Sequence, residues 1–408
     1  MRHLNMTAAI AIAAAMGMAA PALAQNVVFE GGRVIVGDGS APIENATVVV
    51  ENGKITQVGA SSSVKAPAGA TRVDAKGKTI MPTLIDTHVH LSQTKEGIDA
   101  DMKRRAYFGI SAAMSMGVDN TEPPYQYRLA QPAASPRYFY AGRGITRPEP
   151  GRGGEAYWID TAADGIKAVD EQATRKVDII KIWVDDRDEK YKKLTPDLYG
   201  PIIDEAHKKG LRVTAHIFDV TDAKGLLKAN VDAFAHLPRD TDVDDEFMSL
   251  LKAKKDFVQN PNMGARGAVA DVSWLKAALP AAEYAKVEEG NKANAQTAAA
   301  HAIQARNLKK IADAGTTIVM GTDGNTPYAP HFEMEDMALA GMSNMKVLVS
   351  ATGDAAKFLR IPDAGTIAVG KTADILVLDA NPIEDIKNTR KINAVYLKGV
   401  AVDRKAYP

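Results

Sequence analysis

The stretch Thr79-Ile-Met-Pro-Thr-Leu-Ile-Asp-Thr-His-Val-His90 joins an apolar run to a His-x-His pair. The apolar run has the length and composition of a buried strand. Because side chains at i and i+2 of a strand point to the same face, His88 and His90 are predicted to project together from the strand's end. Two imidazoles at this spacing can share one divalent metal ion, although an isolated pair is more often structural. The metal interpretation therefore depends on finding further ligands at the ends of later strands.

Short apolar runs alternate with helical patterns between Thr79 and Arg360. This alternation predicts an α/β fold, namely a (β/α)8 TIM-like barrel. The stretch from Gly264 to Ala300 is rich in Ala, Lys and Glu, is predicted to be helical, and is long enough for a lid over the site. The predicted strands span residues 79–89, 110–118, 136–144, 177–184, 211–216, 231–235, 256–260 and 316–322.

Both ends of the chain show strand and turn patterns instead. Residues 25–78 contain β-rich runs separated by turns such as Asn52-Gly53, a strong hairpin signal. Residues 364–408 show the same pattern of β-rich runs and turns. We predict that these two regions pair into a small composite β-sandwich domain, into which the barrel of residues 79–363 is inserted.

The first 24 residues have the pattern of a secretory signal peptide. A basic start precedes a short apolar stretch, and Pro21-Ala-Leu-Ala24 predicts cleavage after Ala24, so the mature protein is expected to be periplasmic or secreted. The 50 basic and 50 acidic residues balance, which argues against nucleic-acid binding. No later segment is long and apolar enough for a membrane helix. The chain has no cysteine, so any metal site must use His, Lys, carboxylate or backbone ligands.

Polar side chains mark the ends of the later predicted strands, where a barrel carries its function. His216, His236 and Asp323 each end a strand, and Lys181 lies inside the apolar run Ile-Lys-Ile-Trp. A buried amine is costly unless it is paired with a carboxylate or reaches the barrel mouth. The alternative is that Lys181 reacts with carbon dioxide to form a carbamate, an anionic group that can bridge two cations. Asp323 is either a helix cap or, as we favour beside these histidines, a metal ligand and base.

Together these motifs resemble the amidohydrolase superfamily, in its imidazolonepropionase-related and prolidase-like group. The resemblance covers nearly everything after residue 25, including a tail from Ala364 to Asp379 that resembles the return to the β-sandwich. It is specific for fold and metal site and much less so for substrate. The matching motifs are Asp86-Thr-His-Val-His90, Ile180-Lys-Ile182, Thr214-Ala-His216, Ala235-His236 and Gly321-Thr-Asp323.

The resemblance implies a binuclear metal-dependent hydrolase. The first two histidines and Asp323 would hold the more buried ion, the other two histidines the more exposed one, and carbamylated Lys181 and a hydroxide would bridge both. Zinc is the expected metal, with manganese and cobalt as alternatives. The hydroxide would attack an amide, cyclic amide or carbamate, with Asp323 as general acid and base. The implied metal ligands are His88, His90, Lys181, His216, His236 and Asp323.

Three other interpretations are open. The same site could cleave a lactone, ester or phosphoester. A mononuclear deaminase would have no need of Lys181 between two isoleucines. A binding protein that had lost catalysis would usually have lost ligands, and none of the six is missing. We expect a small-molecule substrate, no nucleic-acid or membrane partner after signal removal, and self-association as in related barrels.

Loops after the strands should contact the substrate. Arg143, Arg147 and Arg152 are candidates for binding a substrate carboxylate, with surface charge as the alternative. His331 either lines the pocket or is structural. Related chains often carry Gly-Gly-His-Gly where this one has Gly151-Arg-Gly-Gly154, and the strand-seven region Phe257–Asn262 is unusually polar. These two departures put a dipeptidase-like specificity in question.

Overall fold

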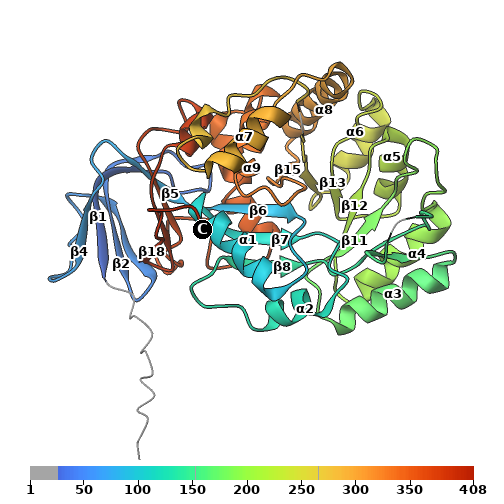
Figure 1. Ribbon diagram of the computed structural model, residues 1–408, viewed down its shortest axis with the longest axis horizontal. Helices are drawn as coiled ribbons and strands as arrows, with labels where there is room; N and C mark the ends of the chain where they lie inside the picture. The colour runs from blue at the N-terminus through green and yellow to red at the C-terminus, as the bar shows by residue number, and fades with distance from the viewer. Residues whose placement is uncertain (1–25, 152, 265) are drawn as a thin grey trace, which may run out of the picture.

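The computed structural model describes residues 26–151, 153–264 and 266–408, so the predicted signal peptide lies outside the described residues. Strands from both ends of the chain form one sheet at one end of the molecule, blue and dark red in Figure 1. Its strand order is β18-β17-β16-β5-β1-β2-β3, with β4 paired to β1. The strands are β1 (Val27–Val34), β2 (Ile43–Glu51), β3 (Lys54–Ala60), β4 (Thr71–Asp74), β5 (Thr79–Pro82), β16 (Ile375–Leu378), β17 (Ile392–Leu397) and β18 (Val400–Ala401).

The two chain ends meet where β16 pairs antiparallel with β5, which in turn pairs with β1. Strands from the two terminal regions thus share one sheet, and β5, which was predicted to belong to the barrel, joins them. These eight strands belong to a single hydrogen-bonded sheet, so the expected sandwich of two sheets is not confirmed.

The apolar run that begins at Thr79 contributes strands to two sheets rather than to one. It divides at Thr83, whose N–H donates to the carbonyl of Asp374, while the next N–H, of Leu84, donates to Gly109. Residues before the division form β5, and those after it form β6, the first strand of the central region. This division places His88 and His90 beside the other parallel strands and away from the terminal sheet.

The central strands are parallel and form two sheets, so closure into one continuous barrel is not confirmed. The smaller sheet has the order β6-β7-β8 and the larger one β10-β9-β11-β12-β13-β14-β15. A parallel bridge between Val89 and Gly324 connects them on one side, and an antiparallel bridge between Val118 and Arg143 does so on the other. The strands are β6 (Leu84–Val89), β7 (Ile110–Ser115), β8 (Arg137–Tyr140), β9 (Gly144–Thr146), β10 (Ala156–Trp158), β11 (Ile180–Trp183), β12 (Val213–His216), β13 (Ala233–Ala235), β14 (Val258–Asn260) and β15 (Thr317–Ile318).

Helices follow most of these strands and lie outside them, as Figure 1 shows for α3 to α6 beside β11 to β13. Local sequence sets their starts: Thr161 and Asp164 form a capping box before α3, and Pro196 begins α4. The helices are α1 (Lys95–Tyr107), α2 (Glu122–Leu129), α3 (Ala162–Thr174), α4 (Pro196–Lys208), α5 (Val220–Lys228), α6 (Asp245–Lys252), α7 (Ala281–Gly290), α8 (Ala295–Asp313), α9 (Ala329–Leu339), α10 (Asn344–Ser350) and α11 (Gly353–Phe358), with 3₁₀ turns η1 (Ser273–Leu275) and η2 (Ile386–Arg390).

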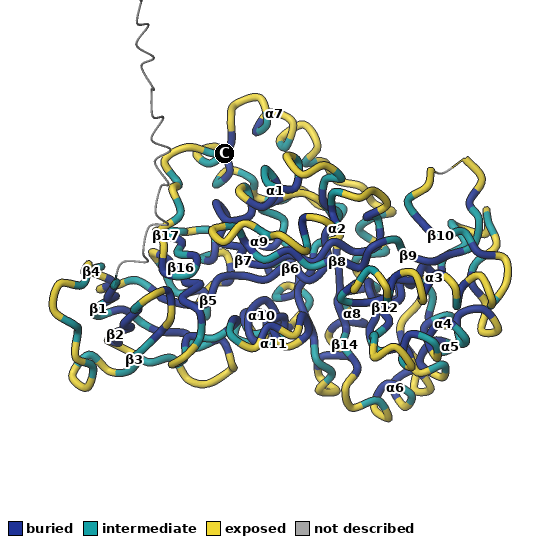
Figure 2. Tube along the Cα trace, turned by 90° about the horizontal axis from the view of Figure 1, so that it is seen from below, coloured by how far each residue is buried: buried dark blue, intermediate teal, exposed yellow. Residues whose placement is uncertain are grey.

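The central strands are buried, whereas the connecting loops carry most of the exposed residues (Figure 2). The predicted lid stretch contains η1, α7 and the beginning of α8. Its Trp274 packs against the rings of Tyr328, His331 and Phe332, so it lies against α9. Within the described part of the chain, no helix combines the length and apolar character needed to cross a membrane.

Candidate metal centre

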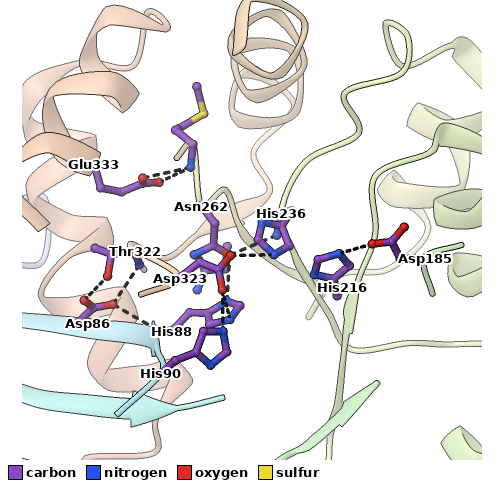
Figure 3. Close-up of polar contacts among 12 residues, drawn as sticks. Asp86, His88, His90, Asp185, His216, His236, Asn262, Thr322, Asp323 and Glu333 are labelled. Atoms are coloured by element: carbon purple, nitrogen blue, oxygen red, sulfur yellow. Dashed lines mark hydrogen bonds and ion pairs between the residues drawn. The ribbon is translucent and has the colours of Figure 1, made fainter. Parts of the chain in front are cut away.

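Five of the predicted ligands come from strand ends that the tertiary structure brings together (Figure 3). His88 is the second-last residue of β6, and His90 directly follows that strand. His216 ends β12, and His236 directly follows β13. Asp323 comes from the loop after β15 and lies among the imidazoles. The C-terminal ends of three strands and the loop after β15 therefore bring these five side chains together.

Asp323 is the common contact of three histidines. Its Oδ1 lies 3.1 Å from His88 Nε2 and 2.8 Å from His90 Nε2, and its Oδ2 lies 3.4 Å from His236 Nε2. The His236 ring in turn lies 4.4 Å from that of His216, measured between centroids. The four imidazoles and one carboxylate therefore form a single contiguous group.

Burial keeps three histidines of this group neutral. It lowers the pKa of His88 to about 3 and that of His216 to about 4, and it holds the pKa of His236 well below its usual value. Burial opposes ionisation of Asp323, but the adjacent imidazoles outweigh it and hold its pKa below the usual range. At neutral pH the site thus offers these three unprotonated imidazoles and one carboxylate, which are the forms that bind metal.

Lys181 lies in β11 and is 1% exposed, with its Nζ buried and lacking a hydrogen-bond partner within the described residues. Burial lowers the pKa of its amine to about 7. Its neighbours are tightly packed: a Cβ added to Gly117 would lie 2.8 Å from Lys181 Cγ. Lys181 is paired in register with Thr214 of β12, the strand that ends at His216, and Asp323 opposes the lowering of the amine pKa.

Two of these residues have unusual backbone conformations. The φ angle is 74° at His236 and 54° at Asp323, in the left-handed region that non-glycine residues seldom occupy. The N–H of Asp323 donates to the carbonyl of His88 at 2.8 Å, which ties the two ligand-bearing segments together. Such conformations cost free energy and are concentrated at functional sites.

Supporting residues that sequence reasoning missed hold the ligands in place. Asn262 Oδ1 accepts a hydrogen bond from His88 Nδ1 at 2.9 Å and another from the backbone N–H of His236 at 3.2 Å. Asp86 accepts hydrogen bonds from the hydroxyl and the N–H of Thr322, at 2.8 and 3.1 Å, and so positions the residue before Asp323. The polar run ending at Asn262 was the available signal, and its partners became visible only in three dimensions.

The other substrate-binding candidates make structural contacts. A guanidinium nitrogen of Arg143 donates to the carbonyl of Ala156 at 2.7 Å, and Arg147 pairs with Asp160 at 2.8 Å. Arg152 lies outside the described residues. His331 is fully buried in α9 and bonded to Thr389 and to the backbone of Phe108, so the structural alternative holds for it.

The donor set fits the metal ions that the sequence suggested. His88, His90 and Asp323 offer ligand atoms that all lie within 4.8 Å of one another. Lys181 Nζ is buried without a hydrogen-bond partner among the described residues, and the buried His88 Nε2 and His236 Nε2 lie near the Asp323 carboxylate without hydrogen-bond geometry. Buried polar atoms normally have partners, so orphaned nitrogens converging beside a carboxylate are what a metal-binding site requires.

Comparison with known proteins agrees with this geometry. Residues 79–402 match the amidohydrolase family, and the chain belongs to that family. It is therefore an enzyme acting on carbon–nitrogen bonds, in a family that typically uses metal ions. The chain is 24% identical over 383 residues to the enamidase of Eubacterium barkeri, covering 88% of this chain and 87% of that protein.

Two further similarities extend over most of the chain. It is 25% identical over 390 residues to the imidazolonepropionase of Streptomyces avermitilis, covering 83% of this chain and 81% of that protein. Its fold is similar to the crystal structure of a protein described as a putative prolidase from Bifidobacterium longum, with a TM-score of 0.78, 23% identity, and coverage of 95% and 96% of the two chains.

Proposed function

We propose that this protein is a binuclear metal-dependent hydrolase of small molecules that cleaves an amide, cyclic amide or carbamate. The observation that carries the proposal is the convergence of four imidazoles and one carboxylate at the ends of different strands. It is joined by a buried lysine in β11 whose Nζ has no hydrogen-bond partner among the described residues. Similarity to proteins named enamidase and imidazolonepropionase supports a C–N bond as the target.

His88, His90 and Asp323 would hold one divalent ion, and His216 and His236 the other. Lys181, as a carbamate formed with carbon dioxide, would supply the shared anionic ligand. Its burial and the absence of a hydrogen-bond partner for Nζ among the described residues support this role. As a carbamate the side chain would bind the ions, whereas the bare amine would be buried without a partner. Zinc suits this set of imidazole and oxygen donors, and manganese or cobalt would also fit it.

When bound, the two ions would lower the pKa of a water molecule and polarise the substrate carbonyl. Asp323 has the position for general acid–base work, because its carboxylate lies at the centre of the histidine group. It would accept a proton as the water oxygen bonds to the acyl carbon, and deliver that proton to the nitrogen as the C–N bond breaks. The products are a carboxylic acid and an amine, which stay in one molecule for a cyclic amide, whereas a carbamate would give a carbonic acid monoester and an amine.

The experiment is a hydrolysis screen with zinc-loaded protein and bicarbonate. The panel should contain N-acyl amino acids, cyclic imides and carbamates, each beside the matched ester or lactone. We expect turnover of at least one C–N substrate, and a loss of about 10²–10⁴-fold in Asp323→Asn. Asp354→Asn is a matched control, because that carboxylate lies in α11 and pairs only with Lys357 among the described residues.

Two outcomes would contradict the proposal. If esters or lactones are hydrolysed and no amide, imide or carbamate is, the target bond is wrong. If Asp323→Asn retains full activity, the assignment of Asp323 as general acid and base is wrong.

We further propose that the protein is exported with cleavage after Ala24, which mass spectrometry of periplasmic protein would test. We also propose a composite terminal domain of residues 25–78 and 364–408, which limited proteolysis would test.

A further inference from the structure

His216 contacts a carboxylate that the hydrolytic proposal does not use. Its Nε2 lies 3.3 Å from Oδ2 of Asp185, and both side chains are 9% exposed (Figure 3). Asp185 lies two residues after the end of β11, the strand that carries Lys181. The contact therefore joins two neighbouring strand ends of the site.

The direction of this hydrogen bond fixes the proton on the ring. An ionised carboxylate only accepts hydrogen bonds, so Nε2 of His216 must carry the proton and donate it. In the neutral imidazole the other nitrogen, Nδ1, is then unprotonated and has a free lone pair. Nδ1 is consequently the atom that His216 can offer to a metal ion.

Asp185 is itself held in place by Arg187. The backbone N–H of Arg187 donates to Oδ1 of Asp185 at 2.9 Å, and its guanidinium Nη1 donates to Oδ2 at 2.5 Å. The same guanidinium lies 3.4 Å from the carboxylate of Glu149, a buried residue in the loop after β9. Two contacts from Arg187 therefore fix the Asp185 carboxylate that orients His216. Arg187 is in turn held by Glu149 from the loop after β9.

The backbone from Arg187 to Glu189 has a strained, left-handed conformation. Arg187, Asp188 and Glu189 have φ angles of 57°, 58° and 64°, three consecutive non-glycine residues in the left-handed region. This conformation brings the guanidinium back onto Asp185, two residues earlier in the chain. Because consecutive left-handed residues are costly, the surrounding contacts must offset the strain.

We propose that Asp185, clamped by Arg187, is a positioning residue that fixes His216 in the Nε2–H tautomer and thereby presents Nδ1 to the metal site. The inference rests on the proposed function only in taking His216 as a metal ligand. Carboxylates that accept a hydrogen bond from a ligating imidazole orient the ring and raise its basicity. Without Asp185 the ring would rotate and exchange tautomers, and one of the two ions would bind more weakly.

The test measures zinc binding rather than activity. Affinity and stoichiometry are obtained by competition with a chromogenic chelator for the wild type, Asp185→Ala and Asp185→Asn. We expect Asp185→Ala to bind one of two zinc ions 10–100-fold more weakly. Asp185→Asn keeps an acceptor for Nε2–H and should restore part of the loss. The matched control is Asp170→Ala in α3, whose carboxylate pairs with Lys209 at 2.7 Å away from this loop and whose loss should leave both affinities unchanged.

A second measurement reads the tautomer in metal-free protein. ¹⁵N–¹H correlation spectra of histidine-labelled protein should show His216 as Nε2–H in the wild type and as a mixture in Asp185→Ala. Unchanged zinc affinity in folded Asp185→Ala, or an Nδ1–H tautomer in the wild type, would overturn the proposal. If Asp185→Ala does not fold, Asp185→Asn and Arg187→Met decide by the same readouts.

These readouts separate the two proposals. Wild-type protein that binds zinc but hydrolyses no member of the panel refutes the proposed function, while the affinity series still tests Asp185. Hydrolysis of a C–N substrate with normal zinc binding in Asp185→Ala refutes only the positioning role.

Discussion

Replacing His331 by Gln should flatten the acid side of the protein's stability profile. His331 is completely buried in α9, and its Nε2 lies 3.1 Å from the carbonyl oxygen of Phe108. Since a carbonyl only accepts, Nε2 carries the proton, and Nδ1 lies 3.0 Å from the hydroxyl of Thr389, which itself donates to the carbonyl of Ile386 at 2.9 Å. A second proton would place a positive charge on a completely buried ring, which is costly in free energy.

Burial lowers the pKa of His331 to about 3, and the positive charges of Arg390 and Arg404 add to the effect. In the unfolded chain the ring has an ordinary pKa of about 6.5. Below that pH the unfolded state binds a proton that the folded state does not. The stability from this group is therefore complete above about pH 6.5 and is lost as pH falls toward 3. Between pH 7 and 5 the loss is about 2 kcal/mol at 1.36 kcal/mol per pKa unit.

The assay is urea unfolding at pH 7, 6 and 5, followed by tryptophan fluorescence. Trp274 is a suitable reporter, because its ring centroid lies 5.6 Å from that of His331. The free energy of unfolding of His331→Gln should fall by about 2 kcal/mol less than that of the wild type between pH 7 and 5. The other buried histidines are present in both proteins and cancel in the comparison.

Thr389→Val is the matched control, since it removes the hydroxyl that bonds to Nδ1 and leaves the imidazole in place. It should be less stable than the wild type at every pH and keep at least the wild-type dependence on pH. Identical pH dependence in the wild type and His331→Gln would refute the reasoning.

Other perturbations probe packing and metal binding. Gly144→Ala should lower the free energy of unfolding by about 1–3 kcal/mol, because the added Cβ would lie 2.0 Å from Trp183; Gly154→Ala, with no atom within 4 Å of its Cβ, should change it little in the same urea titration. Lys181→Met should lower the zinc content measured by mass spectrometry and abolish any stimulation of activity by bicarbonate, and full zinc content would exclude the carbamate. Chelation should abolish hydrolysis and lower stability by about 3–4 kcal/mol relative to protein with zinc at 100–1,000 times its Kd, whereas an unchanged melting temperature would argue against bound metal.

Much of the site was predictable because its signals are local. The period of two in a strand places His88 and His90 on one face, and the apolar run around Lys181 marks a buried amine. Strand ends at His216, His236 and Asp323 could be read in the same way. The structure brings these residues together, and the parallel strands between them follow the predicted order.

Other features depended on distances that local sequence does not encode. Asn262 follows β14, yet it bonds to His88 of β6. Asp185, which follows β11, contacts His216 at the end of the neighbouring strand β12. Arg143 and Arg147 had the chemistry to bind a carboxylate, but nearby carbonyls and Asp160 engage their guanidinium groups.

The sequence by itself determined which residue types end each strand, because side-chain alternation and hydrophobic runs are set by neighbours along the chain. Only the tertiary structure decided that the run beginning at Thr79 divides between two sheets and that Asp323 contacts three imidazoles. It also decided that Asp185 orients the nitrogen of His216. Hydrogen-bond partners and burial arise from packing between segments far apart in sequence, and these set the pKa of buried groups such as His88 and His216 and the ring nitrogen that each can offer to a metal ion.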